Sequence, residues 1–288
     1  MKGIVLAGGT GSRLYPLSAA TSKQLMPVYD KPMIYYPIST LMLAGIRDIL
    51  VISTPDHESD FKRLLGSGES WGVRFSFAAQ ENPNGLPEAL IIGEQFLEGD
   101  SCALILGDNL FYGMGLGESL RDKSSKLNGA RIFCQEVRDP ERYGIVEFDD
   151  SGAILSIVEK PTNPRSNLAA TGLYFFDSNA SAYAKTLKPS NRGELEISEL
   201  LEIYLANGQL HAEILERGAV WLDTGTFDSL ASASEFVRVV QQRQGLKISC
   251  PEEVAFNLGY ISRQKLQQIA SSGTGEYFEY LKHISSQD

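Results

Sequence analysis

Three glycines and two cations follow one another closely near the start of the chain. The stretch AGGTGSRLYPLSAATSKQ contains Gly8, Gly9 and Gly11, then Arg13 and Lys23. Glycines let the backbone approach a ligand closely and turn several N–H groups toward it, which suits phosphate oxygens. The two cations could then clamp a nucleoside triphosphate. An arginine and a lysine on an ordinary solvated surface are the competing interpretation, which their place beside a glycine turn disfavours.

Neither of the common phosphate-binding loops fits this stretch. No third glycine follows Gly11 at the spacing of a dinucleotide fingerprint, and no lysine follows the glycines until Lys23, so the P-loop pattern is missing as well. A dinucleotide-dependent oxidoreductase is therefore the least favoured class of enzyme.

Carboxylates and further cations follow several other apolar runs. Asp108 comes after the run in LILGDNLFYG, and Asp223 after the run in AVWLDTGT. Two aspartates at strand ends suit Mg²⁺, which takes few carboxylates and keeps positions for water and phosphate. For Asp108 alone, a capping aspartate is an equally good interpretation. Glu159-Lys160 follows another strand and Arg192 precedes a helix, but each of these is a weak signal alone.

Composition limits the classes of function. The chain has 288 residues, of which 43% are hydrophobic and 22% charged, as in an ordinary globular protein of one large domain or two small ones. The formal net charge of −10 argues against a nucleic-acid or anionic-membrane binder. Any phosphate chemistry must therefore depend on a few local cations.

Cysteines and histidines narrow the choice further. The three cysteines are widely spaced without a C-x-x-C pair, which predicts reduced thiols in a cytoplasm. The three histidines are too scattered for a zinc site or a histidine-based triad. The N-terminal apolar run is too short for a signal peptide and no run approaches a membrane span, so we expect a soluble, cytoplasmic protein.

Strands and helices alternate in the first part of the chain. The expected strands are 2–7, 49–53, 73–79 and 103–106, and the expected helices are 34–44, 58–65 and 88–96. This alternation predicts an α/β fold whose mostly parallel sheet has helices on both faces. Ligands bind beyond the carboxyl ends of such strands. The glycine turn, Gln80 and Asp108 should therefore meet at one edge of the sheet.

The rest of the chain is first rich in strands and then helical. Short strands are expected at 130–137, 144–148, 153–159, 172–176 and 211–216, with helices at 178–186 and 196–206. From 227 the pattern is helical, at 227–242, 262–270 and 277–284. We expect an α/β body with a β-rich insertion and a helical C-terminal segment.

The motifs, taken in order, resemble those of the sugar-phosphate nucleotidylyltransferases, and most closely their thymidylyltransferase branch. They are LAGGTGSRLYPLSAATSKQLMPVYDKPMIYYP, LGDN, DPERYGIVEFD, EKP, ATGLYFF, RGELEI and WLDTGT, and they cover nearly the whole chain. The resemblance implies a Rossmann-like nucleotidyltransferase fold and a Mg²⁺-dependent reaction of dTTP with α-D-glucose 1-phosphate. The products would be pyrophosphate and dTDP-glucose, which feeds deoxysugar pathways such as that to dTDP-rhamnose.

The resemblance also implies a division of the chain and the roles of its residues. A catalytic domain would span 1–226, with its nucleotide part to about 130 and its sugar-phosphate part from about 131, followed by a helical segment 227–288. The nucleotide would be bound by Gly8, Gly9, Thr10, Gly11, Arg13, Lys23, Gln24, Gln80, Gly85 and Asp108. The sugar phosphate would be bound by Asn109, Tyr143, Gly144, Glu159, Lys160, Ala170, Thr171 and Arg192. The metal ligands would be Asp108 and Asp223, and the catalytic set would be these two with Arg13, Lys23 and Lys160.

One departure from the family lies beside this site. Relatives commonly read Gly-Leu-Ala-Gln-Ala where this chain has Gly85-Leu86-Pro87-Glu88-Ala89. The glycine is kept, but the contacts to base or sugar are affected.

The implied chemistry agrees with the residues present. The attacking phosphate oxygen is already ionised at neutral pH, so no general base is required, which matches the scarcity of histidines. We expect direct in-line transfer, with cations lowering the repulsion between two anions. The alternatives are a uridylyltransferase, a nucleotide-sugar glycosyltransferase and a non-catalytic sugar-nucleotide sensor. A glycosyltransferase would favour an Asp-x-Asp motif, and a sensor should lack some of the cations or carboxylates.

The family also implies an assembly and a second nucleotide site. Its members are typically homotetramers, and the segment RQGLKISCPEEVAFNLGYI resembles part of an effector site near subunit interfaces. Met114 and Asn257 stand where relatives often have histidine and arginine. Because asparagine lacks the charge and reach of arginine, we expect a tetramer with weakened feedback inhibition.

Overall fold

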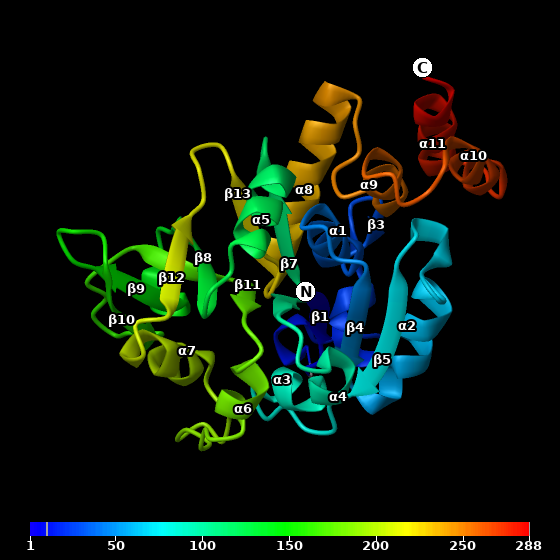
Figure 1. Ribbon diagram of the computed structural model, residues 1–288. Helices are drawn as coiled ribbons and strands as arrows, with labels where there is room; N and C mark the ends of the chain where they lie inside the picture. The colour runs from blue at the N-terminus through cyan, green and yellow to red at the C-terminus, as the bar shows by residue number, and fades with distance from the viewer. Residues whose placement is uncertain (10, 288) are drawn as a thin grey trace.

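A nine-stranded mixed sheet forms the centre of the molecule (Figure 1). The computed structural model describes residues 1–9 and 11–287. The parallel half of the sheet contains β1 (Lys2–Ala7), β4 (Asp48–Ser53), β5 (Arg74–Ala79) and β6 (Cys102–Leu106), in the spatial order β6-β1-β4-β5. The sequence predicted each of these strands to within one residue. The strands β1, β4 and β6 are buried on both faces and form continuous apolar runs, whereas β5 lies at the edge of the sheet and is partly exposed.

The remaining strands extend the same sheet. They are β8 (Ala130–Glu136), β9 (Gly144–Phe148), β10 (Ile154–Glu159), β11 (Leu168–Phe176) and β12 (Leu210–Ile214). The strand β11 runs antiparallel to β6 on one side and to β8 and β9 on the other, so the β-rich insertion continues the parallel half. In Figure 1 these strands lie on the left and the parallel ones toward the right. The mixed, mostly parallel α/β sheet is confirmed.

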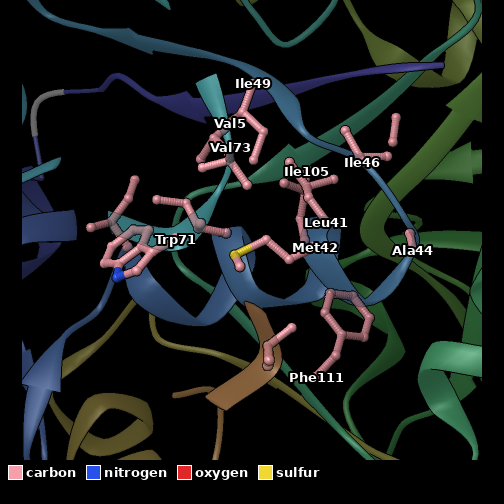
Figure 2. Packing of buried hydrophobic residues seen from close by; sticks show 14 of the residues in the cluster. Val5, Leu41, Met42, Ala44, Ile46, Ile49, Trp71, Val73, Ile105 and Phe111 are labelled. Carbon is pink, nitrogen blue, oxygen red and sulfur yellow. The ribbon is translucent and has the colours of Figure 1, made fainter. Parts of the chain in front are cut away.

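Helices cover both faces of the sheet. One face carries α1 (Tyr35–Leu43), α2 (Glu58–Leu65), α5 (Leu116–Ser125), α9 (Pro251–Asn257), α10 (Arg263–Ser271) and α11 (Glu276–Ser286). The other carries α3 (Glu88–Ile92), α4 (Glu94–Leu97), α6 (Ala180–Ala184) and α7 (Ile197–Ala206). Figure 2 shows Leu41 and Met42 of α1 packed among Val5, Ile49 and Ile105 of the sheet. The next residues along these strands face the opposite core, as the period of two requires.

Two short ribbons and a long helix complete the fold. The ribbons are β2 (Pro27–Val28) with β3 (Lys31–Pro32), and β7 (Asn109–Tyr112) with β13 (Val220–Asp223). The helix α8 (Phe227–Gln244) packs on both ribbons through a third apolar cluster. Its first turn is capped by Thr226, whose hydroxyl accepts the Ser229 N–H at 3.2 Å. No helix in the described residues is long and apolar enough to cross a membrane.

Several elements differ from the predicted ones, and two of these differences have a local cause. The expected helix 88–96 is divided at Gly93, which ends α3 and begins α4 where the chain crosses β1. A Cβ at Gly93 would lie only 2.7 Å from Ile4 Cδ1 of β1. The helices α5 and α9 and the strand β7 were not predicted. Of these, α5 is polar and has only Leu120 buried, so its apolar pattern is too weak to read.

Candidate active site

The strands β1, β5 and β6 end at the same edge of the sheet, as predicted, because they run parallel. The glycine turn follows β1 there, and both Gly9 (φ +96°) and Gly11 (φ +60°) have positive φ. Side chains with a Cβ rarely adopt this conformation, so the two glycines are required for the turn. Thr10, a predicted nucleotide contact, lies outside the described residues.

Two buried glutamines lie beside Gly8 at the start of this turn. Gln24 accepts a hydrogen bond from the Ser22 hydroxyl (2.7 Å) and donates one to the Gly8 carbonyl oxygen (3.3 Å). Its carboxamide therefore stabilises the start of the glycine turn. Gln80 follows β5, and its Oε1 would lie 2.8 Å from a Cβ at position 8. Both side chains thus belong to the wall of the turn, where a nucleotide was predicted.

Two carboxylates meet beside the glycine turn. Asp108 follows β6 and forms an ion pair with Lys23, while its Oδ1 accepts a hydrogen bond from the Asn109 amide (2.9 Å). Asp223 ends β13, where it pairs in register with Asn109 of β7. Thr224 links the end of β13 to Asp108. Its hydroxyl (2.7 Å) and its backbone N–H (3.2 Å) both donate hydrogen bonds to the Asp108 carbonyl oxygen. The ribbon therefore brings together aspartates that are far apart in the sequence.

The two aspartates and three basic residues influence one another electrostatically. Burial raises the pKa of Asp223 above its ordinary value, and the negative charge of Asp108 raises it further. The charges of Lys23, Arg142 and Arg13 oppose that rise in the pKa. An ionised pair of carboxylates is thus only partly compensated by the protein. A divalent cation between them would supply the missing positive charge.

A cavity of about 170 Å³ opens over this pair and the glycine turn. Its described lining is Gly11, Ser12, Arg13, Lys23, Asp108, Asp223 and Gly225. Within the described part of the chain, no cluster of three or more His, Cys, Asp or Glu side chains could hold a metal. A pair of aspartates alone suits Mg²⁺, which keeps several water or phosphate ligands. The donor set therefore fits the metal that the sequence predicted.

A larger cavity of about 630 Å³ adjoins the first and takes in every predicted sugar-phosphate residue. These are Asn109, Tyr143, Gly144, Glu159, Lys160, Ala170, Thr171 and Arg192. Tyr143 and Trp221 form an edge-to-face aromatic pair on its wall, with ring centroids 5.1 Å apart. The Thr171 hydroxyl is fully buried and has no hydrogen-bond partner among the described residues.

The cations of the larger cavity are held by acidic side chains. Arg192 donates two hydrogen bonds to Glu196, at 3.0 and 2.6 Å, and Lys160 forms an ion pair with Glu159 at 3.0 Å. Although burial opposes it, hydrogen bonds from Arg192 and Ser190 hold the pKa of Glu196 below its usual range. The Arg192 side chain is 45% exposed, so its guanidinium is fixed in direction and still reachable.

The two cavities share Arg13 and Asp223. Arg13 is exposed and forms no ion pair with any described residue, so its charge faces the junction. A residue that the sequence reasoning missed, Arg142, lies at the same place. Its Nη2 is 3.8 Å from Asp223 Oδ2, and its Nη1 donates to Asp139 at 2.6 Å. The DPERYG motif contained this arginine, but an exposed arginine in a turn gives no signal of its own.

Gly85 joins the nucleotide side of the site to the sugar-phosphate side. It forms an isolated bridge with Leu195 and has φ +104°, and a Cβ here would overlap the Leu195 backbone. We expect Gly85→Ala to lower the free energy of unfolding by about 2 kcal/mol or more, from backbone strain and steric overlap together. Thermal and urea unfolding would measure this.

Gly99 provides the matched control for that substitution. It also has a positive φ (+82°), but nothing lies within 4 Å of its Cβ position. Gly99→Ala should therefore cost only the strain, about 1 kcal/mol. Equal losses in the two variants would show that the contact with Leu195 is not the cause.

The chain is similar in sequence to the members of one enzyme family. A family model described as nucleotidyl transferase matches residues 2–239. The chain is 53% identical over 285 residues to a protein of Xanthomonas campestris pv. campestris named glucose-1-phosphate thymidylyltransferase, covering 99% of this chain and 97% of that one. A protein of the same name from Neisseria meningitidis is 52% identical, covering 99% of each chain. Another, from Mycobacterium tuberculosis, is 53% identical, covering 96% of this chain and 97% of that one.

Solved structures show the same architecture. A crystal structure of a Bacillus anthracis protein described as a glucose-1-phosphate thymidylyltransferase, in complex with a sucrose, has a TM-score of 0.77 and 41% identity. The match covers 83% of this chain and 95% of that one. A structure of UDP-glucose pyrophosphorylase complexed with UDP-glucose has a TM-score of 0.73 at 22% identity, covering 83% and 98%. At that identity the likeness concerns the fold alone, and it confirms the Rossmann-like nucleotidyltransferase architecture.

Proposed function

Because the chain belongs to the nucleotidyl transferase family and, within it, to the glucose-1-phosphate thymidylyltransferases, we propose that it joins dTTP and α-D-glucose 1-phosphate. The products are dTDP-glucose and pyrophosphate. The observation that supports this most is the junction of the two cavities at Arg13 and Asp223. Two anionic substrates can meet there beside a cation that no described acidic side chain neutralises.

Each substrate has a cavity that suits its chemistry. The triphosphate lies along the glycine turn in the smaller cavity, within reach of Lys23 and Arg13. Glucose 1-phosphate lies in the larger cavity, where Lys160 and Arg192 bind its phosphate. The Glu159 carboxylate and the unpartnered Thr171 hydroxyl bind sugar hydroxyls. This arrangement places the sugar phosphate oxygen toward the α-phosphate of the nucleotide.

The reaction is a single displacement at phosphorus. An oxygen of glucose 1-phosphate forms a bond to the α-phosphorus, the bond from that phosphorus to the bridging oxygen breaks, and pyrophosphate leaves with the electron pair. No proton has to be removed, which agrees with the lack of histidine among the described lining residues of both cavities. Arg13 and Lys23 neutralise the charges that approach one another, so the encounter of two anions becomes possible.

Mg²⁺ is part of the proposal, with Asp108 and Asp223 as its protein ligands. Bound there, the metal would neutralise charge on the phosphates and on the leaving pyrophosphate. Lys23 forms an ion pair with Asp108 and so fixes the direction of that carboxylate at the cavity.

A pyrophosphate-release assay over a grid of nucleotides and sugar 1-phosphates tests the function. We expect the highest kcat/KM with dTTP and glucose 1-phosphate, no turnover in EDTA, and recovery with Mg²⁺. UTP belongs in the grid because one methyl group gives only about 10- to 200-fold discrimination in a pocket. A higher kcat/KM for UTP would favour the uridylyltransferase. A burst of pyrophosphate without glucose 1-phosphate would contradict direct transfer.

Assembly and pathway stay predictions from the family, and location stays a prediction from the cysteine spacing and the N-terminal sequence. We propose a homotetramer in the cytoplasm that supplies dTDP-glucose for dTDP-deoxysugar synthesis of the rhamnose type. The residues expected near an effector site lie apart on one chain. Met114 is fully exposed beside one cavity, while Glu253 and Asn257 line another of about 250 Å³.

Arg192→Ala should mainly raise the KM for glucose 1-phosphate. Arg192 binds a phosphate that is already charged in the ground state, so its loss weakens binding of substrate and transition state alike. We expect KM to rise about 10- to 100-fold, with kcat within about threefold, since hydrogen bonds to charged groups contribute about 1.5–3 kcal/mol. Steady-state kinetics at saturating dTTP would measure both constants.

Arg238 is the matched control for Arg192. It also donates two hydrogen bonds to a nearby glutamate, Glu235, but it lies on the exposed face of α8. Arg238→Ala should leave both constants unchanged. A fall in kcat without a change in KM for Arg192→Ala would mean that its charge acts only in the transition state.

A further inference from the structure

Gln80 is a buried side chain with one end fully bonded and the other end open. Only 5% of the residue is exposed. Its Nε2 donates to Glu88 Oε2 at 2.6 Å and to the Gly85 carbonyl oxygen at 3.2 Å. No described residue donates a hydrogen bond to its Oε1, which lies over Gly8 at the start of the glycine turn.

The partners of Nε2 fix the orientation of the Gln80 carboxamide. A carboxylate and a backbone carbonyl only accept hydrogen bonds, so the NH₂ end of Gln80 has to face them. Rotating the amide by half a turn would place Oε1 against the Glu88 carboxylate oxygen, a contact of two acceptors. Glu88 is itself held, because its Oε1 accepts from the Asn84 amide at 2.8 Å. The Oε1 of Gln80 is therefore presented as an acceptor.

A glutamine at position 88 would leave only the Gly85 carbonyl oxygen, at the longer distance of 3.2 Å, to require the NH₂ end of Gln80. Its side-chain amide can donate or accept, so either end of Gln80 could face it. The carboxylate in this chain removes that choice. An acceptor that no described residue partners then disfavours any ligand that brings a second acceptor to the same point.

We infer that Glu88 is a positioning residue for base selection, acting through Gln80. The inference rests on the proposed function and on the predicted contact of Gln80 with the nucleotide, which we take to be with the base. With Oε1 as the acceptor, the site takes a base that offers an N–H there, as the imide of thymine or uracil does at N3. Cytosine has a lone pair at N3, so dCTP sets two acceptors against each other.

The alternative is that Glu88 only stabilises the fold, and a different result would then be expected. Glu88 lies in the first turn of α3, where a carboxylate interacts favourably with the helix dipole. That effect is the same whichever nucleotide is bound. The ratio of kcat/KM for dTTP to kcat/KM for dCTP therefore separates the two roles.

The experiment compares this ratio in the full-length wild-type enzyme and in Glu88→Gln, with glucose 1-phosphate saturating. We expect E88Q to lower the ratio about tenfold or more. A tenfold change in the ratio corresponds to the free-energy contribution of about one hydrogen bond. The change should lie in KM for both nucleotides, with kcat for dTTP within about twofold. Glu88→Ala removes the acceptor altogether and should lower the ratio in the same direction, so the test survives if E88Q fails to fold.

Asn84→Ala is the matched control. It removes a hydrogen bond to Glu88 but leaves the bond between Glu88 Oε2 and Gln80, so the ratio should stay at the wild-type value. An unchanged ratio in active E88Q and E88A would overturn the inference and leave the proposed function standing. A wild-type enzyme that releases no pyrophosphate from dTTP and glucose 1-phosphate would overturn the proposed function itself.

Discussion

Asp223→Asn is expected to reduce turnover by about 1,000-fold or more without lowering the stability of the metal-free protein. The substitution keeps the shape of the side chain but removes one of the two charges offered to Mg²⁺. Asp108→Asn should lose activity to a similar extent, because the cation then faces a single carboxylate beside Lys23. Pyrophosphate release at saturating substrates would measure both losses.

The stability of Asp223→Asn follows from the raised pKa of Asp223. A carboxyl group whose folded pKa lies above its unfolded value binds protons more tightly in the fold, so stability falls as pH rises through that range. At neutral pH the ionised Asp223 therefore destabilises the metal-free fold, and asparagine removes this cost. In EDTA the melting temperature of Asp223→Asn should equal or exceed that of the wild type. Near-wild-type turnover at limiting Mg²⁺ in a folded variant would exclude the replaced aspartate from the metal site.

Arg13→Ala is expected to lower kcat about 100- to 1,000-fold, with a much smaller change in KM. The Arg13 guanidinium faces the junction of the two cavities, where charge redistributes as one bond to phosphorus forms and another breaks. Its interaction is therefore stronger in the transition state than in the ground state. Arg192→Ala should show the opposite pattern, with a large change in KM and a small change in kcat. If the two patterns were exchanged, the two arginines would have exchanged roles.

Two variants control the Arg13 experiment. Arg13→Lys keeps the charge but loses the planar fork of donors, so it should recover only part of kcat. Arg165→Ala removes a comparably exposed arginine that forms no described ion pair, and it should be neutral. A loss of kcat in Arg165→Ala would indicate that long-range charge, and not contact with the reacting phosphates, is responsible.

Local patterns in the sequence are enough to predict the strands of the central sheet and the types of chemical groups at their ends. The apolar runs of β1, β4 and β6 are buried on both faces, and the residues after them lie at one edge because the strands are parallel. Strand ends alone therefore point to the glycine turn, Asp108 and Asp223 as candidates. They cannot place Asp223 beside Asp108, because no local pattern pairs β7 with β13 across a separation of more than a hundred residues.

Other features of the site depend on contacts that a sequence does not display. The hydrogen bonds that join the Gln24 carboxamide to Ser22 and Gly8 are an example, and the predicted contact of Gln24 with the nucleotide stays a prediction. The importance of Arg142 comes only from its distance to Asp223. The likeness to a family supplied the substrates, and the orientation of Gln80 came only from its three-dimensional neighbours.

The pairing of β7 with β13 has a consequence for the newly synthesised chain. All nine strands of the central sheet end by Ile214, so the ribosome has delivered the whole sheet before it reaches Asp223. A nascent or prematurely terminated chain can therefore complete its main sheet with only one of the two proposed metal ligands present. If both aspartates are required as proposed, an unfinished chain would stay inactive until the short strand β13 had paired with β7.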